Sequence, residues 1–277
     1  MKKCAVINDL SGFGKCSLGA AIPIISSMGC EVHPLLTAVL SNQTAYDSYD
    51  IVSLTDSMSS FIQQWKRLGA SFDAILTGFV CDENQIDIIN AFADEFKDDN
   101  TIFVVDPVMA DNGSLYDCYT PIMCEKIKSL CYNADVITPN TGELAFIAEE
   151  PYSENIEDIK AYCSKLINNG IKNIVVTGLK KGKEISNIVY DSDGCTVITG
   201  RLSGGYFSGT GDIFSSIITG GLIRGLSIVK SAELATDFIS TCAYDTKCSP
   251  GNDGVNFEKF LYLLTNYDYQ EELNREK

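Results

Sequence analysis

The 277-residue sequence has little histidine, few basic residues and no long apolar run. Its one histidine, His33, excludes metal sites that need two histidine ligands and argues against a His-dependent nucleophilic triad. No run of 18 or more apolar residues occurs, so we expect no membrane span and no membrane partner. The net charge of −16 comes from 37 acidic and 21 basic residues, which disfavours a basic face for nucleic acid.

Eleven cysteines are present, but no two of them form a C-x-x-C pair, which argues against a zinc ribbon or a thioredoxin-type centre. We expect reduced thiols that pack as small apolar residues. The amino-terminal MKKCAVINDLSG has a short apolar stretch that fits a first buried strand better than a signal peptide. These features together predict a cytoplasmic protein.

Short runs rich in Val and Ile alternate with helical patterns along most of the chain. Buried strands are predicted over residues 3–8, 73–78, 101–106, 134–139 and 173–178. Helices are predicted between them at about 16–28, 57–68, 83–97, 119–132 and 155–169. This alternation predicts an α/β fold whose parallel sheet carries helices on both faces.

The last third of the chain follows a different pattern. Residues 184–200 place two β-rich runs around SDG, which predicts an antiparallel hairpin near the sheet edge. Two or three helices are then expected, at about 210–224, 229–246 and 255–266, with residues 268–277 as a solvated helix end. No internal repeat or linker interrupts the sequence, so we expect residues 1–277 to form a single domain.

Polar and glycine-rich segments follow the predicted strands at their carboxyl ends. They are INDLSGFG, TGF, DPVMADNGSLY, TPNTGE and TGLKKG. Ligands of open parallel sheets bind beyond the carboxyl ends of the strands. The sequence therefore predicts an enzyme that acts on a small molecule at this edge.

The first of these segments, GFGKCSLG at residues 12–19, fits neither common nucleotide fingerprint. Position 17 is serine where a dinucleotide fingerprint needs glycine, and the spacing before Lys15 does not match a P-loop. We interpret the segment as a close-approach turn that lets the neighbouring Asp9 face a polar ligand. A plain helix cap is the alternative.

The stretch FSGTGDIFSS, residues 207–216, joins a glycine-rich turn to a lone carboxylate at a predicted helix start. Consecutive N–H groups of Gly209, Thr210 and Gly211 can point one way and hold the charge of a transferring phosphoryl group. Asp212 beside them is placed to accept the proton of an attacking alcohol. The simpler alternative is an aspartate that only caps the helix.

Two further segments supply oxygen ligands. Asn140 and Glu143 stand three residues apart at a strand-to-helix turn and can share one helix face. Asp106 and Asp111 lie beyond a neighbouring strand end. Such oxygens suit Mg²⁺, which commonly bridges protein carboxylates and substrate phosphates.

The motifs GTGD, DPVM, TPN-x-x-E and SNQT together resemble the ribokinase superfamily, and within it the pyridoxal kinases, from residue 3 to about 225. The run DPVMADNGSLY fits pyridoxal kinases especially well. The resemblance implies a ribokinase-like three-layer α/β/α sandwich with a mostly parallel central sheet and a minimal lid. It also implies ATP-dependent phosphorylation of the 5′-hydroxymethyl group of pyridoxal, pyridoxine or pyridoxamine (vitamin B6 salvage). The implied cofactors are Mg²⁺ and a monovalent cation, K⁺ or Na⁺, and the implied assembly is a homodimer.

The resemblance assigns roles by position. Asp212 would be the base and residues 209–211 the anion hole, while Asp9, Thr44 and Phe79 would contact the vitamin ring beside Asp212. Metal binding would fall to Asp111, Thr138 and Glu143. ATP would contact Asp106, Tyr116, Asn140, Thr177, Gly178, Gly209, Thr210 and Gly211, with residues 204–207 near the nucleotide.

Asp9 departs from the pyridoxal kinase pattern, which often has serine there, and is similar to the hydroxymethylpyrimidine kinases of thiamine synthesis. Those kinases tend to carry a lid cysteine soon after DPVM, where this chain has Asp111. A hydroxymethylpyrimidine (phosphate) kinase is therefore the alternative enzyme. A non-catalytic vitamin-binding protein is the alternative from another class, and the presence of Asp212, Asn140 and Glu143 together disfavours it.

Overall fold

The computed structural model describes residues 1–277 except 112, 117–118, 202–206, 247–252 and 266–277. In this part of the chain nine strands form one sheet in the order β11-β10-β9-β8-β5-β4-β1-β2-β3. Neighbouring strands in the run β9-β8-β5-β4-β1-β2 are parallel. By contrast, β3 pairs antiparallel with β2, β10 with β9, and β11 with β10. The strands are β1 (Lys2–Ser11), β2 (Cys30–Leu40), β3 (Ile51–Ser53), β4 (Ala74–Thr77), β5 (Ile102–Val105), β8 (Val136–Ile137), β9 (Ile174–Lys181), β10 (Glu184–Asp191) and β11 (Gly194–Arg201).

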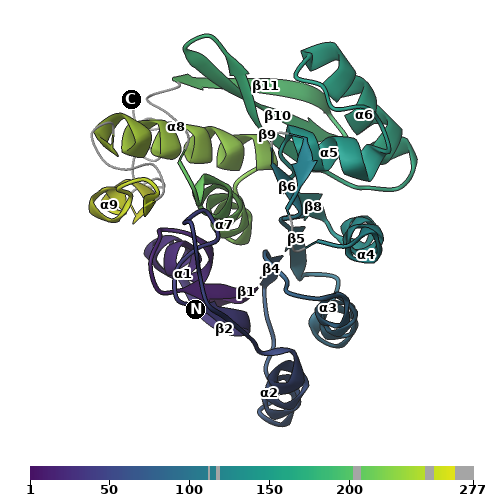
Figure 1. The fold of residues 1–277 in the computed structure, drawn as a ribbon, viewed down its shortest axis with the longest axis vertical. Coiled ribbons are helices and arrows are strands. Elements are labelled where there is room, and N and C mark those ends of the chain that lie inside the picture. Colours follow the sequence, from purple (N-terminus) through teal and green to yellow (C-terminus); the bar gives the residue numbers. More distant parts are fainter. Residues whose placement is uncertain (112, 117–118, 202–206, 247–252, 266–277) are drawn as a thin grey trace.

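Helices cover both faces of this sheet, so the predicted three-layer α/β/α sandwich is confirmed (Figure 1). One face carries α1 (Ser17–Ser27), α7 (Thr210–Ile223), α8 (Ile228–Thr246) and α9 (Tyr262–Thr265). The other face carries α2 (Thr55–Arg67), α3 (Glu83–Phe96), α4 (Pro121–Asn133), α5 (Thr141–Ala148) and α6 (Ile156–Asn168).

The central strand β1 shows why the strands read as continuous apolar runs. Its side chains alternate, so Cys4 and Val6 join the core under α1, α7 and α8, while Ala5 and Ile7 join the core under α2 to α6. All four are fully buried. A strand buried on both faces has no polar side, which is typical of parallel sheets between helix layers.

The predicted strands and helices are present, and the predicted edge hairpin is formed by β10 and β11. The prediction of a helix over residues 255–266 is wrong. Val255 and Phe257 are buried in a segment without regular secondary structure, where the Phe257 N–H donates to the Val255 carbonyl. A 3₁₀ turn (Glu258–Phe260) and the short α9 follow. Residues 268–277 lie outside the described residues.

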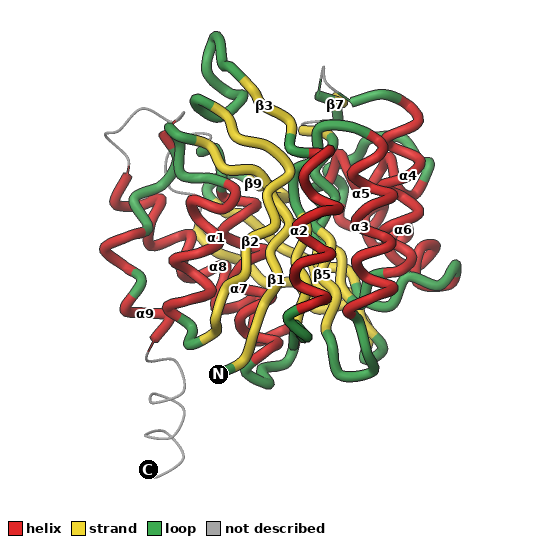
Figure 2. Tube along the Cα trace, turned by 90° about the horizontal axis from the view of Figure 1, so that it is seen from below, coloured by secondary structure: helices red, strands yellow, loops and turns green. Residues whose placement is uncertain are grey.

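Small elements stand beyond the carboxyl ends of the strands, as expected for a minimal lid (Figure 2). Strand β2 pairs in parallel with β1 up to its last residue, and residues 38–40 also pair antiparallel with β3. A separate two-stranded hairpin, β6 (Ala110–Asp111) and β7 (Ser114–Leu115), follows β5. None of the described helices is long and apolar enough to cross a membrane.

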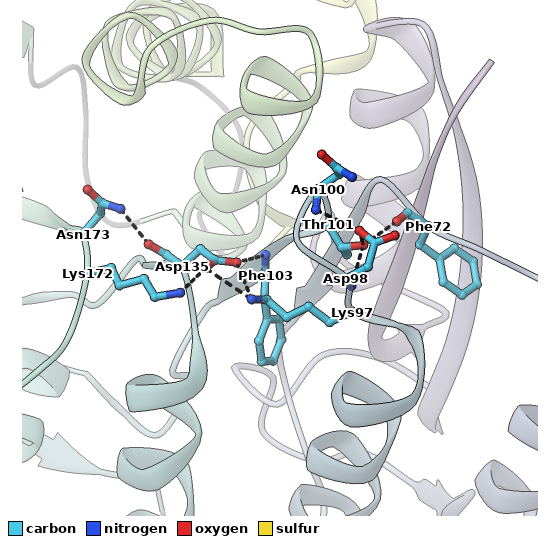
Figure 3. Close-up of polar contacts among 9 residues, drawn as sticks. All are labelled: Phe72, Lys97, Asp98, Asn100, Thr101, Phe103, Asp135, Lys172 and Asn173. Carbon is cyan, nitrogen blue, oxygen red and sulfur yellow. Dashed lines mark hydrogen bonds and ion pairs between the residues drawn. The ribbon is translucent and has the colours of Figure 1, made fainter.

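The opposite, amino-terminal edge of the sheet is held by a charge network around Asp135 (Figure 3). Its carboxylate accepts a hydrogen bond from the backbone N–H of Phe103 at 2.8 Å. Lys97 and Lys172 approach the same carboxylate to 3.2 and 2.6 Å. The carbonyl of Asp135 accepts from the Asn173 amide at 2.8 Å, so one residue ties the starts of β5, β8 and β9 together.

We predict that Asp135→Asn lowers the free energy of unfolding by about 2 kcal/mol at pH 7, because hydrogen bonds to a charged group are lost. Burial alone would raise the pKa of Asp135, but Lys172, the Phe103 N–H and Lys97 together hold it below its usual value. The stabilisation is therefore present above the unfolded-state pKa and disappears as the pH falls through the folded-state pKa. Urea unfolding of both proteins at neutral and at strongly acidic pH measures this, and a difference that is equal at both would contradict it.

Candidate active site

A cleft of about 280 Å³ lies at the carboxyl edge of the sheet, where the motifs of the sequence meet. It is bounded by the ends of β5, β8 and β9, by the start of α7 and by α8. Every residue that the resemblance assigns to ATP or metal lines it: Asp106, Asp111, Tyr116, Thr138, Asn140, Glu143, Thr177, Gly178, Gly209, Thr210 and Gly211, together with Asp212.

The start of α7 forms one wall of this cleft. Gly209 precedes the helix with a positive φ of 78°, and a Cβ there would stand 2.1 Å from the Lys15 carbonyl oxygen, so only glycine fits. A Cβ on Gly211 would meet only Asp106, at 3.9 Å, so Gly211 leaves open space rather than relieving a clash. The first N–H groups of a helix lack intrahelical acceptors and carry its positive end. This turn therefore suits an anion.

Asp212 lies half-buried in the first turn of α7, at the cleft. Burial raises the pKa of its carboxyl to about 6, against the lowering effects of the Ser17 backbone N–H and the Asn8 side chain. The Asn8 amide donates a 3.0 Å hydrogen bond to Asp212 Oδ1. A carboxylate with a pKa near neutrality is suited to take a proton from an alcohol.

Two buried carboxyl groups, those of Asp106 and Glu143, also line the cleft. Burial and the nearby charge of Asp212 raise the pKa of Asp106 to about 8. Burial, with the Asp106 charge, also raises the pKa of Glu143 well above its usual value. These carboxyl groups repel one another, and a bound cation would favour their ionised forms.

Glu143 also has a structural role, which the sequence alone indicates only partly. Its carboxylate accepts from the Asn140 N–H at 2.9 Å, and the Asn140 side chain accepts from the Glu143 N–H at 2.9 Å, which completes a capping box at the start of α5. The other Glu143 oxygen accepts from the Met109 N–H at 3.2 Å. Glu143 thus fixes the DPVM loop against α5.

The donor set fits Mg²⁺ held jointly with phosphates and water. No group of three or more His, Cys, Asp or Glu side chains among the described residues is placed to hold a metal alone. The Thr138 hydroxyl is buried at the cleft and has no hydrogen-bond partner in the described part of the chain. Mg²⁺ in such sites takes one or two protein carboxylates and completes its shell with phosphate oxygens and water.

Apart from Phe207, which the resemblance placed near the nucleotide, the far end of the cleft was not foreseen from the sequence. Asn187 on β10 accepts from the Gly178 N–H at 3.1 Å and donates to the Thr236 hydroxyl on α8 at 2.8 Å. Apolar side chains continue the wall beyond it: Ile185, Phe207, Phe214, Ile239 and Ala243. A sequence signal was available only for Asn187, as a polar residue inside a β-rich run. Residues 204–206, expected near the nucleotide, lie outside the described residues.

The residues predicted to hold the vitamin ring are not among the described residues that line this cleft. Thr44 is exposed, and Phe79 is half-buried against Tyr119, with ring centroids 6.3 Å apart. Asp9 is buried, accepts from the Ser11 hydroxyl at 2.9 Å, and has its pKa raised by burial.

Asn8 joins two of these residues to the cleft, and sequence reasoning missed it. Its amide oxygen accepts from the N–H groups of Asp9 and Phe79, each at 2.9 Å, while its nitrogen bonds Asp212. The available signal was an Asn at the carboxyl end of a strand, directly before the Asp9 that had been singled out.

Comparisons with known proteins agree with this architecture. A Bacteroides thetaiotaomicron protein, provisionally assigned as a phosphomethylpyrimidine kinase and crystallised with pyridoxal, superposes with a TM-score of 0.90 at 37% identity, covering 95% of both chains. Pyridoxal kinase from Lactobacillus plantarum superposes with a TM-score of 0.90 at 26% identity, covering 98% of this chain and 99% of that one. Pyridoxal kinase from Dictyostelium discoideum is 28% identical over 264 residues, which is 88% of this chain and 86% of its own.

The family model for phosphomethylpyrimidine kinase matches residues 18–256. The match extends past residue 225, where the sequence resemblance had stopped, and includes α8, which lines the cleft. The chain belongs to the phosphomethylpyrimidine kinase family.

Proposed function

We propose that this protein is a vitamin B6 kinase that transfers the γ-phosphoryl group of ATP to the 5′-hydroxymethyl group of pyridoxal, pyridoxine or pyridoxamine. The observation that carries the proposal is the Asp212 carboxylate, which lines the cleft beside the glycine turn at the start of α7 and has its pKa raised to about 6. The names of the Dictyostelium and Lactobacillus relatives support it, as does the pyridoxal in the Bacteroides crystal.

In this reaction Asp212 accepts the hydroxyl proton while the alcohol oxygen attacks the γ-phosphorus. The bond from that phosphorus to the bridging oxygen breaks, ADP leaves, and the products are the 5′-phosphate ester and a proton. The N–H groups of residues 209–211 stabilise the charge on the transferring group. Mg²⁺, held near Asp106 and Thr138 together with the phosphates, would neutralise further charge.

The two ends of the cleft suit the two ends of ATP. The polar end holds the helix start and the carboxyl groups, where phosphates and metal would lie. The apolar end, between β10 and α8, offers Ile185, Ile239 and Ala243 to a flat base. Asn140 and Thr177, which form an isolated parallel bridge, also line the cleft.

A second candidate activity is phosphorylation of hydroxymethylpyrimidine or its phosphate. The buried carboxyl of Asp9 favours it, because this group can pair with an exocyclic amine or a protonated ring nitrogen. The family name favours it too. Asp9 would stabilise bound pyridoxal, which lacks an amine, less than it would stabilise bound pyridoxamine.

We further propose that the enzyme works in the cytoplasm as one domain and uses K⁺ or Na⁺ beside Mg²⁺. No disulfide links the nine described cysteines to one another, and most of them are buried. Buried cysteines without disulfides are typical of a reducing compartment.

We predict that ADP release with MgATP and K⁺ depends on a B6 vitamer and falls at least about a hundredfold in Asp212→Asn, the scale of a lost general base. The assay is run with pyridoxal, pyridoxine, pyridoxamine and hydroxymethylpyrimidine. Wild-type kcat/KM should also fall as the pH drops through about 6, because Asp212 becomes protonated. Turnover of the pyrimidine alone would establish the second candidate, and no turnover with any of the four would refute both.

Asp9→Ser should change the order of preference among substrates. We expect kcat/KM for pyridoxamine and hydroxymethylpyrimidine to fall about tenfold more than for pyridoxal, because an ionic hydrogen bond to the amine is lost. The isosteric Asp9→Asn serves as the control that keeps the shape and removes the charge. An unchanged ranking in both variants would show that Asp9 does not select the substrate.

The exposed edge strand β3 supports the homodimer that the resemblance implied. Ile51 and Val52 are 43% and 62% exposed at the end of the sheet, and Val39, which pairs with Val52, is also exposed. Such an unpaired apolar edge favours pairing with a second copy. Light scattering should give twice the 30.2 kDa chain mass for the wild type and a monomer for Val52→Glu. A monomeric wild type would refute the dimer.

A further inference from the structure

Asn8 lies at the carboxyl end of β1, is only 3% exposed, and makes hydrogen bonds in three directions. We propose that Asn8 is a positioning residue for the reaction, which holds the Asp212 carboxylate ionised and oriented while it fixes the backbone of Asp9 and Phe79. The inference rests on the proposed function, in which Asp212 is the base.

The orientation of the Asn8 amide follows from its neighbours. Two backbone N–H groups, those of Asp9 and Phe79, point at one end of the amide, and N–H groups can only donate. The amide oxygen must therefore face them. The NH₂ group is left to face Asp212, whose carboxylate accepts best when it is ionised.

The neighbouring strand is shaped to admit this side chain. Strands β1 and β4 pair in parallel, with Ile7 beside Thr77, so Gly78 follows directly next to Asn8. A Cβ on Gly78 would lie 2.4 Å from the Asn8 amide nitrogen and 2.6 Å from its amide carbon. Any larger residue at 78 would push the amide away from Asp212.

The other groups around Asp212 determine how much the hydrogen bond from Asn8 contributes to the ionisation of its carboxyl group. Among the described residues, Asp9 on β1, Asp106 beyond β5 and Cys16 before α1 are titratable neighbours that interact with it. None of the three carries a positive charge, and ionised Asp9 and Asp106 oppose a second negative charge nearby. The Ser17 N–H and the Asn8 amide act in the other direction and lower the pKa of Asp212.

Asn8 also links the base to the proposed ring-binding residues. Asp212 follows Asn8 by 204 positions in the chain, and Phe79 follows it by 71. One side chain therefore sets the distance between the base and the segments that would hold the vitamin. A displaced amide would disturb proton transfer more than it disturbs ATP binding, because Asn8 is absent from the residues that line the nucleotide cleft.

The test compares the pH dependence of kcat/KM for the B6 vitamer in wild type, Asn8→Asp, Asn8→Ala and Gly78→Ala. Asn8→Asp keeps the acceptor for both backbone N–H groups but loses the donor and adds a negative charge. We expect the acidic limb of its pH profile, where kcat/KM falls at low pH, to shift to higher pH by about one unit or more. Its kcat/KM at pH 7 should fall at least about tenfold. The limb should move up less in Asn8→Ala, and KM for ATP should change less than about twofold in both.

Gly78→Ala leaves Asn8 in place but forces its amide aside, so it should shift the limb in the same direction. It also carries the test if a variant at position 8 fails to fold. Thr101→Val is the matched control, since it removes a buried hydrogen bond to the Phe72 carbonyl at the opposite edge of the sheet (Figure 3). It should lower the melting temperature without moving the limb.

Variants at 8 and 78 that lose activity but keep the wild-type acidic limb would overturn the proposal and leave Asn8 a structural residue. Failure of the proposed function is distinguishable, because the wild type itself would then release no ADP with any vitamer. Active wild type with an unmoved limb in the variants refutes only the role of Asn8.

Discussion

The clustering of three carboxyl groups, two buried and one half-buried, is the constraint on which the site depends. Asp106, Glu143 and Asp212 lie at the carboxyl edge of the sheet, and burial raises the pKa of each. Ionised carboxylates so placed repel one another and lose hydration. The arrangement is stable with protons or with cations, and MgATP would bring both a metal ion and the phosphates that the helix start receives.

The backbone around these groups is shaped to keep them in place. Gly209 lets the start of α7 rest directly on the Lys15 carbonyl, which joins the first loop of the chain to the turn before Asp212. Glu143 and Asn140 cap α5 reciprocally and hold the Met109 loop. The negative charge therefore sits in a rigid frame of backbone N–H groups, which costs little reorganisation when a phosphoryl group moves.

The two edges of the sheet use carboxylates in opposite ways. Asp135 is paired with Lys97 and Lys172 at the amino edge, where its pKa is lowered and its charge stabilises the fold. Asp106, at the carboxyl edge, has its pKa raised to about 8 because burial and the Asp212 charge disfavour its ionised form. Stability and reactivity are thus separated along one set of strands, which is what a parallel sheet with all its carboxyl ends on one side permits.

The sequence by itself determined the alternation of strands and helices and the glycine turn before Asp212. Each depends on local period or on residue types that are adjacent in the chain. It also indicated which strand ends carry chemistry, so the ATP and metal residues were found to share one cleft. The expected helix over residues 255–266 fails because Val255 and Phe257 are buried by packing against the core in an irregular segment, not by a helical period.

Only the tertiary structure decided the contacts between distant segments. Asn8 meets Asp212 across 204 positions, and Asn187 meets Thr236 across 49, because of the strand order and of where α7 and α8 dock. No local pattern encodes such a pair, since neither partner's sequence neighbours constrain the other. The motif supplies the carboxylate, and the packing of separate elements supplies the hydrogen bonds and burial that set its pKa.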